Sequence, residues 1–282
     1  IRFPEKKKSD FIRYLAMIQN IDENTGLLMD FLDKEGLSEN TILIFLTDNG
    51  STFGNLYYNA GMRGRKTTPY EGGHRVPFFL RWPEGGLMSP ADIEGLTQVQ
   101  DILPTVLELC RIEYDPRQFD GSSLASVLKG TEKVPDDRTI FINYSRMPLY
   151  FDYPSPYSDV KVRKKQTVVL HKSWRLINDD ELYDLDNDYS QKENVIHKKT
   201  EIARELRMKR DQWWKELNVD ANEIVKIPIG DNQENPVLIT SCEWMNVLVD
   251  MQSQIRKGES KNSYWLLEVK EVGDYIFRLR RW

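Results

Sequence analysis

The chain has 282 residues, which suffices for one large domain or for about two to three small ones. Its formal net charge of -5 at pH 7 gives no case for nucleic acid or an anionic membrane surface as a partner. Two cysteines cannot build a disulfide framework, and no apolar run approaches the roughly 18 residues of a membrane-spanning helix. We therefore expect a globular protein without a membrane span.

The first predicted element is a helix over residues 10–35. Apolar side chains recur there at helical spacing, among them Phe11, Leu15 and Ile18. Gly36 follows and favours a helix C-terminus. Residues 41–47 then form an almost continuous apolar run, which is typical of a strand buried on both faces in a parallel sheet.

Asp48, Asn49 and Gly50 follow this strand directly. In open α/β sheets, ligands bind at the carboxyl ends of the strands, so these side chains stand at a candidate site. Carboxylate and amide oxygens are hard donors of the kind that calcium or magnesium takes. The alternative is a simple turn, because Asn-Gly is a strong turn signal in any context.

A cationic segment flanked by glycines occupies residues 61–66. Its cations are Arg63, Arg65 and Lys66. Glycines let the backbone approach a ligand closely, and clustered cations suit an anion, whereas a solvated loop is the alternative. Residues 67–73 read TTPYEGG and lead to a second apolar strand, predicted at residues 76–82.

These segments together resemble the sulfatase family of the alkaline-phosphatase superfamily. Family members carry a (T/S)DNG segment after a buried strand, and later an RGGKGTTYEGG-R-P segment before a strand that ends in WP. Residues 47–50 match the first segment, and Lys66 stands five residues before Glu71 as in the family. The second segment is matched by residues 63–73 with Arg75, Pro77, Trp82 and Pro83. The departures are Arg65 and Thr67 in place of glycines, and an inserted Pro69.

The resemblance implies a role for each matched residue. Asp48 and Asn49 would ligate calcium, or magnesium in its place, and Lys66 would act as the catalytic residue that binds the sulfate group. Candidate substrate contacts are Arg63, Arg65 and His74. His74 stands where the family has an aliphatic residue, and an ordinary hydrogen bond is the alternative for it.

The nucleophile that the family requires is missing from this sequence. Sulfatases use an aldehyde hydrate made from the first residue of a C/S-x-P/A-x-R motif, which neither Cys110 nor Cys242 begins. Residues 123–127 come closest, but Val127 replaces the Arg. The chain also opens at Ile1 without an initiator Met or a signal peptide. We therefore expect a truncated chain, inactive alone, whose missing N-terminal half supplies the nucleophile.

Further elements follow in chain order. Residues 99–109 predict a helix with Pro104 in or near its first turn, and residues 138–143 a short strand. Residues 146–158 are rich in Pro and Tyr and predict an irregular loop, whose aromatic rings either border the substrate cleft or pack.

The C-terminal part begins with three alternating segments that predict a small antiparallel sheet: residues 168–171, 174–177 and 181–185. Residues 181–195 resemble the family's C-terminal subdomain, with Tyr189 in place of the usual Pro, and residues 200–217 predict an amphipathic helix. Three later runs predict a small antiparallel β module: residues 236–240, 264–269 and 273–282. Its Trp244 and Trp265 either bind carbohydrate or pack the module.

The predicted fold is α/β: part of an alkaline-phosphatase-like sheet with flanking helices, a small antiparallel α+β subdomain and a C-terminal β module. The predicted boundaries are 1–160, 161–221 and 222–282. The predicted protein is the C-terminal fragment of a calcium-dependent sulfatase that acts on aryl or carbohydrate sulfates, in the periplasm or outside the cell. The alternatives are a phosphatase or phosphodiesterase of the same superfamily, whose zinc site would want several histidines, and a non-catalytic carbohydrate-binding module.

Overall fold

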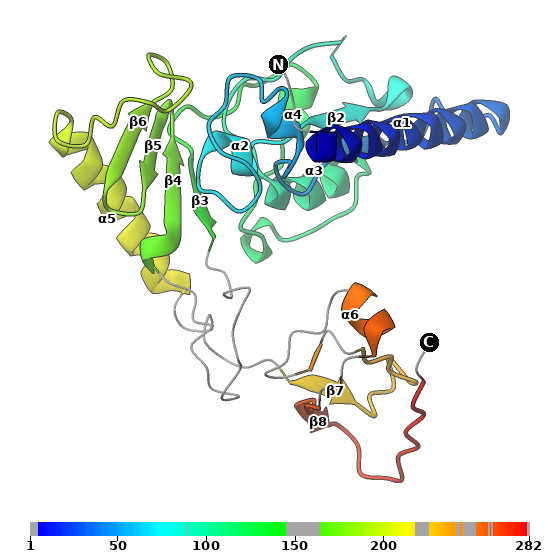
Figure 1. Ribbon diagram of the computed structural model, residues 1–282. Helices are drawn as coiled ribbons and strands as arrows, with labels where there is room; N and C mark the ends of the chain where they lie inside the picture. Colours follow the sequence, from blue (N-terminus) through cyan, green and yellow to red (C-terminus); the bar gives the residue numbers. More distant parts are fainter. Residues whose placement is uncertain are drawn as a thin grey trace. The chain divides into compact units, whose positions relative to one another are not determined.

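The computed structural model describes residues 5–88, 90–144, 164–217, 226–240, 243–244, 252–258, 260 and 262–280. Two compact units are present (Figure 1), and the first consists of Ile1–Tyr144 with Arg163–Trp214. The second consists of Ser145–Val162 with Lys215–Trp282. The boundaries predicted from the sequence, after residues 160 and 221, lie outside the described residues, as does the predicted loop at 146–158.

The first unit begins with α1 (Glu5–Lys34), which confirms the predicted N-terminal helix. Gly36 has a φ of 68° and ends the helix, because the Leu37 amide donates to the Leu32 carbonyl and the Gly36 amide donates to the Asp33 carbonyl. This pair of hydrogen bonds is the Schellman arrangement that glycine favours. Among the described residues of the predicted apolar face, only Leu32 is buried.

The predicted strand pair forms, but not in a parallel sheet. β1 (Leu43–Leu46) pairs antiparallel with β2 (Phe78–Arg81), and Phe45 lies opposite Phe79. The side chains are also not buried on both faces, since Phe45 is 38% and Phe79 is 65% exposed. An apolar run predicts that a strand packs against other apolar residues. It does not predict the direction of pairing, which depends on how the chain returns from one strand to the next.

A group of short helices connects this ribbon to the rest of the unit. α3 (Ile102–Leu109) follows a capping box in which the side chains of Gln98 and Asp101 and the two backbone amides bond reciprocally. Pro104 lies in its first turn, as predicted. The other helices of this part are η1 (Gly54–Leu56), α2 (Glu71–His74), η2 (Pro83–Gly85), η3 (Val99–Asp101), η4 (Pro116–Gln118), α4 (Ala125–Leu128) and η5 (Lys164–Gln166).

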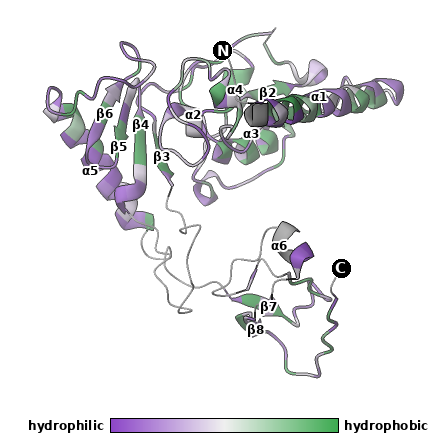
Figure 2. Ribbon diagram, viewed as in Figure 1, coloured by the Kyte–Doolittle hydropathy of each residue, from purple (hydrophilic) through white to green (hydrophobic). Residues whose placement is uncertain are grey.

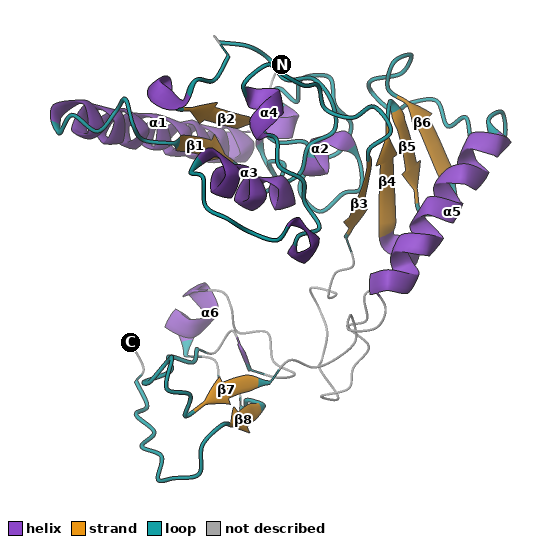
Figure 3. Cartoon of the chain, turned by 180° about the vertical axis from the view of Figure 1, so that it is seen from behind, coloured by secondary structure: helices purple, strands orange, loops and turns teal. Residues whose placement is uncertain are grey.

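Four strands form an antiparallel sheet in the order β3-β4-β5-β6. Their bounds are Thr139–Asn143, Thr167–His171, Trp174–Ile177 and Glu181–Asp184. The helix α5 (Thr200–Leu217) runs along one face of this sheet (Figure 3). The predicted antiparallel sheet and the amphipathic helix are both confirmed.

Both faces of this sheet are buried. On the helix side, Val169, Leu176 and Leu182 pack with Ala203 and Leu206 of α5. The opposite face carries a second buried cluster: Ile140, Val168, Leu170, Ile177 and Tyr183, against which Tyr70 and Leu96 pack. Figure 2 shows this hydrophobic sheet beside a mostly hydrophilic α5. The face of the sheet opposite α5 is therefore covered by the N-terminal part of the chain, including the segment around Tyr70.

The second unit contains β7 (Ile227–Ile229), β8 (Leu267–Val269) and α6 (Gln252–Lys257). Its two strands pair parallel, so the prediction of an antiparallel module is wrong for the described residues. Residues 236–240 and 273–280 form no strand. Alternation predicts extended backbone, but a strand also needs a partner, and Pro236 lacks the amide that pairing requires.

The two tryptophans of this unit pack together. The rings of Trp244 and Trp265 lie 5.7 Å apart at 60°, and the Trp265 indole nitrogen donates to the Thr240 carbonyl at 2.9 Å. This geometry favours the packing role over a free sugar-binding platform. Over the part of the chain that the structure describes, no helix has the length and apolarity to cross a bilayer.

Candidate functional site

The segment that follows β1 is bonded to the turn that follows the cationic loop. The Gly50 amide donates to the Gly73 carbonyl at 3.0 Å. A Cβ atom on Gly50 would lie 1.8 Å from the Gly72 carbonyl oxygen, so the close approach requires glycine. Asp48 and Asn49 immediately precede this contact, and the exposed carboxylate of Asp48 is therefore held near the turn.

The cationic loop is closed by its own hydrogen bonds. Thr68 Oγ1 accepts from the Arg65 amide at 2.9 Å and donates to the Arg65 carbonyl at 2.7 Å. A Cβ atom on Gly73 would lie 2.1 Å from the Thr68 carbonyl oxygen, so this glycine also touches the loop. Gly73 thus contacts both the end of β1 and the turn that carries Lys66, which is exposed.

Thr67 occupies the tip of this turn in an unusual backbone conformation. Its φ is 72°, in the left-handed region that favours glycine. A β-branched residue is strained there. The family pattern places glycine at this position, and the backbone of this chain retains the conformation that glycine would serve.

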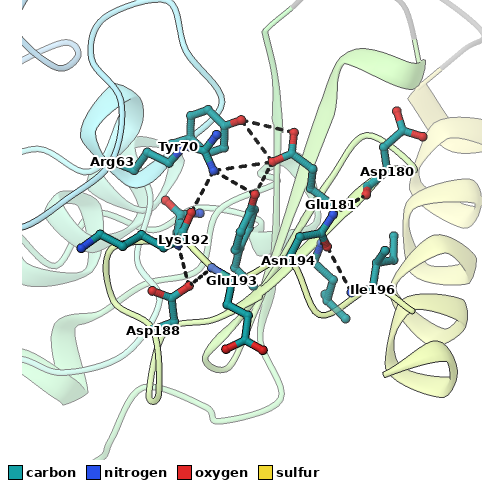
Figure 4. Close-up of polar contacts among 12 residues, drawn as sticks. Arg63, Tyr70, Asp180, Glu181, Asp188, Lys192, Glu193, Asn194 and Ile196 are labelled. Carbon is teal, nitrogen blue, oxygen red and sulfur yellow. Dashed lines mark hydrogen bonds and ion pairs between the residues drawn. The ribbon is translucent and has the colours of Figure 1, made fainter. Parts of the chain in front are cut away.

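Arg63 lies inside a group of side chains rather than free at the loop surface (Figure 4). Its Nη1 donates to Tyr183 Oη at 2.9 Å and to the Gln191 carbonyl at 2.8 Å. The guanidinium carbon lies 3.8 Å from the centre of the Tyr70 ring, and Nη1 lies 3.8 Å from Glu181. These contacts give Arg63 a structural role, and its role as a substrate contact stays a prediction.

Glu181 joins the two tyrosines of this group. Tyr70 Oη lies 3.1 Å from Glu181 Oε2 (Figure 4). Tyr183 Oη also donates to that carboxylate. Burial, followed by the hydrogen bond to Glu181, raises the pKa of Tyr183 to about 12. Burial and the charge of Glu181 also raise the pKa of Tyr70. Both hydroxyls therefore stay protonated at neutral pH and act as donors.

Glu71 is the buried anion beneath the loop. It is 2% exposed, and its Oε1 accepts from Arg175 Nε at 2.7 Å and lies 3.2 Å from His74 Nε2. Its amide donates to Gln191 Oε1 at 3.0 Å. Burial alone would raise the pKa of Glu71, but the His74 hydrogen bond and the Arg175 charge outweigh burial and lower the pKa to about 2.

This contact uses the Nε2 atom of His74 and matches the ordinary hydrogen bond considered as its alternative role, whereas the buried Nδ1 atom has no hydrogen-bond partner among the described residues. Its role as a substrate contact stays a prediction, as do the roles of Asp48, Asn49 and Lys66. The structure brings the Asp48 segment and the Lys66 turn to the same backbone turn, and it leaves Arg65 exposed.

Sequence reasoning assigned no role to three residues of the site: Glu71, which it used only to match the motif, and Arg175 and Gln191. The sequence contains a weak signal for Arg175, because this residue is charged in an otherwise apolar strand, WRLI. Such a residue is buried only when it is paired, so an ion pair could have been expected. Nothing in the sequence named Glu71, 104 residues away, as the partner.

The metal ligands expected from the family resemblance fit calcium in kind but not in number. Asp48 and Asn49 supply hard oxygen donors, whereas calcium takes about six to eight. In the ranges that the structure describes, His, Cys, Asp and Glu form no group of three or more that could hold a metal ion. These two residues could therefore contribute to a calcium site and cannot complete it.

Two family models match the chain. The model described as "Sulfatase" matches residues 2–112. The model described as "N-sulphoglucosamine sulphohydrolase, C-terminal" matches residues 65–216, which is more than half of the chain.

Individual relatives agree with these matches. A sulfatase of Formosa agariphila is 30% identical over 198 residues, 65% of this chain and 35% of its own length. An N-acetylglucosamine-6-O-sulfatase of Bacteroides thetaiotaomicron is 28% identical over 190 residues, 66% of this chain and 32% of its own length. The matched part of this chain therefore spans about a third of the length of these relatives.

The fold is similar to that of solved structures. The crystal structure of Ps i-CgsB in complex with k-i-k-neocarrahexaose superimposes with a TM-score of 0.57 at 21% identity. The match covers 75% of this chain and 46% of that one. With the α/β architecture and the two family models, this likeness leads to one conclusion: the chain belongs to the sulfatase family and has an alkaline-phosphatase-like fold.

Proposed function

We propose that this chain is the C-terminal, metal- and sulfate-binding portion of a sulfatase that hydrolyses sulfate esters of carbohydrates. The observation that carries the proposal is the bond between Gly50 and Gly73, which holds the Asp48 segment beside the turn that carries Lys66. A sulfate ester presents an anion, and it would meet an exposed ammonium group and hard oxygen ligands at one backbone turn.

The residues of this chain have separate tasks. Lys66 would place a compact positive charge beside the negatively charged sulfate oxygens and hold the group for reaction. Asp48 and Asn49 would hold a calcium ion in part, and a bound calcium ion polarises sulfate oxygens as a Lewis acid. The buried Glu71 would keep the turn between these groups in place.

The nucleophile would come from another part of the same polypeptide. This sequence contains no C/S-x-P/A-x-R motif at either cysteine, and relatives extend well beyond the part that matches this chain. An upstream half that carries formylglycine would complete the site, so we expect no turnover from this chain alone. The resemblance to bacterial sulfatases also supports action in the periplasm or outside the cell.

A carbohydrate substrate is favoured over an aryl sulfate because relatives named for carbohydrates match 66% and 58% of this chain, whereas an arylsulfatase and a steryl-sulfatase match 43% and 48%. The Bacteroides thetaiotaomicron relative is named for the 6-O-sulfate of N-acetylglucosamine, and its match covers 66% of this chain. A sulfated amino sugar or a glycan that contains it is therefore the first substrate to test.

The test joins this chain to an upstream half with a C-x-P-x-R motif that has been converted to formylglycine. We expect sulfate release from N-acetylglucosamine 6-sulfate, a loss on calcium chelation, and a drop of about 10²–10³ in kcat for Lys66→Ala. Lys133→Ala, at an exposed lysine in a different segment, serves as the matched control. Faster release of phosphate from the 6-phosphate analogue, or full activity of Lys66→Ala, would contradict the proposal.

A further inference from the structure

The segment from Arg63 to Glu71, which contains the three cations of the loop, is anchored at several points to the β3–β6 sheet and to Gln191 beyond it. At its start, Arg63 donates to Tyr183 and to the Gln191 carbonyl. Near its end, Tyr70 donates to Glu181. At its end, Glu71 binds Arg175 through its carboxylate and Gln191 through its amide. Each contact joins parts of the chain more than 100 residues apart.

Arg175 is a buried anchor with hydrogen bonds both to its own strand region and to Glu71. It is 5% exposed, and its Nη1 donates to the carbonyls of Lys172 at 2.9 Å and Trp174 at 3.0 Å. These two bonds fix the guanidinium on β5, which leaves Nε to donate to Glu71 Oε1 at 2.7 Å. The planar fork of arginine makes this double attachment, which the single ammonium group of lysine cannot reproduce.

A short path leads from Glu71 to the site. Gly72, the next residue, donates its amide to the Arg63 carbonyl at 2.8 Å. Gly73 then accepts from Gly50 at 3.0 Å and packs against the Thr68 carbonyl. A displacement of Glu71 must therefore move the backbone that holds both the Asp48 segment and the Lys66 turn.

We propose that Arg175 is a positioning residue for the sulfate site: through Glu71 it holds the backbone turn that sets Lys66 against Asp48 and Asn49. Gln191 assists by binding the Glu71 amide. Arg175 touches no reacting group in this arrangement, and its effect on catalysis rests on the proposed function. Its effect on the geometry of the loop does not depend on the proposed function.

Hydrogen exchange on the chain as it stands tests the geometry. In Arg175→Met, we expect the amides of Gly50, Gly72 and Gly73 to exchange at least about tenfold faster. The matched control is Arg210→Met. Arg210 is also a buried arginine of this unit, but it belongs to α5 and binds Asn178, Asp179 and Asp211, which lie outside the loop. Its distance to Asp179 is 2.8 Å. A general loss of stability would speed exchange in both variants, whereas positioning predicts a local effect in Arg175→Met alone.

A second variant covers the case in which Arg175→Met does not fold, because it leaves the Glu71 charge buried without its strongest partner. The double variant Glu71→Gln with Arg175→Met removes both charges and should fold. It should still exchange about tenfold faster at the Gly50 and Gly73 amides. Wild-type exchange at these amides in either folded variant would overturn the proposal.

Activity separates this proposal from the proposed function. In the active polypeptide assembled with an upstream half, we expect kcat for Arg175→Met to fall about 100-fold, as for a misplaced catalytic group, while Arg210→Met stays within a few-fold of wild type. Equal kcat losses in the two variants would overturn the positioning role. Faster loop exchange in a polypeptide that releases no sulfate would instead support the positioning of the loop and refute the sulfatase function.

Discussion

The Gly50 amide lies 3.0 Å from the Gly73 carbonyl oxygen, so the end of β1 and the turn after the cationic loop share a backbone hydrogen bond. Neither residue offers a side chain, and the two backbones approach closely for that reason. The contact joins the segment that carries Asp48 and Asn49 to Gly73, which also touches the turn that carries Lys66.

Gly50→Ala should disrupt this contact. Its Cβ would lie 1.8 Å from the Gly72 carbonyl oxygen, so the backbone must shift, and we expect a loss of about 1–3 kcal/mol in the free energy of unfolding. Gly26→Ala provides a control of opposite sign. Gly26 lies inside α1 with nothing within 4 Å of its Cβ position, so alanine should stabilise by about 0.5–1 kcal/mol. Urea denaturation measures both, and an unchanged Gly50→Ala would contradict the close approach.

Thr67→Gly should stabilise the loop. A φ of 72° costs a β-branched residue about 1–2 kcal/mol, and glycine removes that strain at some cost in unfolded-state entropy, so we expect a net gain of about 0.5–1 kcal/mol. Thr52→Gly is the matched change at an exposed threonine without positive φ, and it should destabilise. Thermal unfolding compares the two variants. If both lower the melting temperature equally, Thr67 is not strained.

Glu71 should make stability depend on pH in acid. Its pKa is lowered to about 2 in the folded chain, below the ordinary value of 4.5. Its contribution is therefore present above pH 4.5 and is lost as the pH falls from about 4.5 to about 2. This pKa shift corresponds to a contribution of about 3 kcal/mol to the free energy of unfolding above pH 4.5.

Urea denaturation at a series of pH values tests this dependence. Glu71→Gln should flatten the curve of unfolding free energy between pH 4.5 and 2. Asp115→Asn is the control, because the pKa of Asp115 is also lowered, by its hydrogen bond with Arg117, but that pair is exposed. A curve for Glu71→Gln that keeps the slope of the unaltered chain would show that another carboxylate is responsible.

Tyr183→Phe should weaken the anchor of Arg63. The change removes a hydroxyl that accepts from Arg63 at 2.9 Å and donates to Glu181, and it leaves both charged groups with one partner fewer. We expect a loss of about 1–3 kcal/mol, measured by chemical denaturation. Tyr58→Phe, at a ring that is 81% exposed, should change stability little. Equal losses in the two variants would argue against a stabilising role for the hydrogen bonds of the Tyr183 hydroxyl.

Calcium should bind this chain alone weakly or undetectably. Asp48 and Asn49 offer at most three side-chain oxygen atoms, and calcium takes about six to eight. Calorimetric titration of the unaltered chain, Asp48→Ala and the exposed Asp92→Ala should give three similar, nearly flat isotherms. Micromolar calcium binding that Asp48→Ala abolishes and Asp92→Ala does not would contradict this prediction, because further calcium ligands would then have to come from this chain.

Sequence reasoning succeeded where local pattern decides the structure. α5 and the strands β4, β5 and β6 appeared at their predicted places, because the apolar residues of each, such as Val169 and Leu206, recur with the period of the element. The prediction that the first helix ends at Gly36 was confirmed for a similar reason, since residues close in sequence determine where a helix ends.

The failures concern partners that lie far away in the sequence. Whether the neighbour of Phe45 runs parallel or antiparallel is decided by the path between the strands. The run that contains Leu238 pairs with no strand among the described residues, and that side chain is 83% exposed. The same holds for the site. The segment around Lys66 could be recognised from its pattern, whereas the ion pair of Glu71 with Arg175 depends on the folded arrangement of two distant segments.

The burial of the β3–β6 sheet on both faces has a consequence for protein engineering. Tyr70 packs on the face opposite α5, so the loop that carries Lys66 is also part of a hydrophobic core. A loop graft from a relative would replace that core surface together with the cations. Residues 61–75 and 174–191 would therefore have to be exchanged as one cassette, since either segment moved alone would meet a partner shaped for a different sequence.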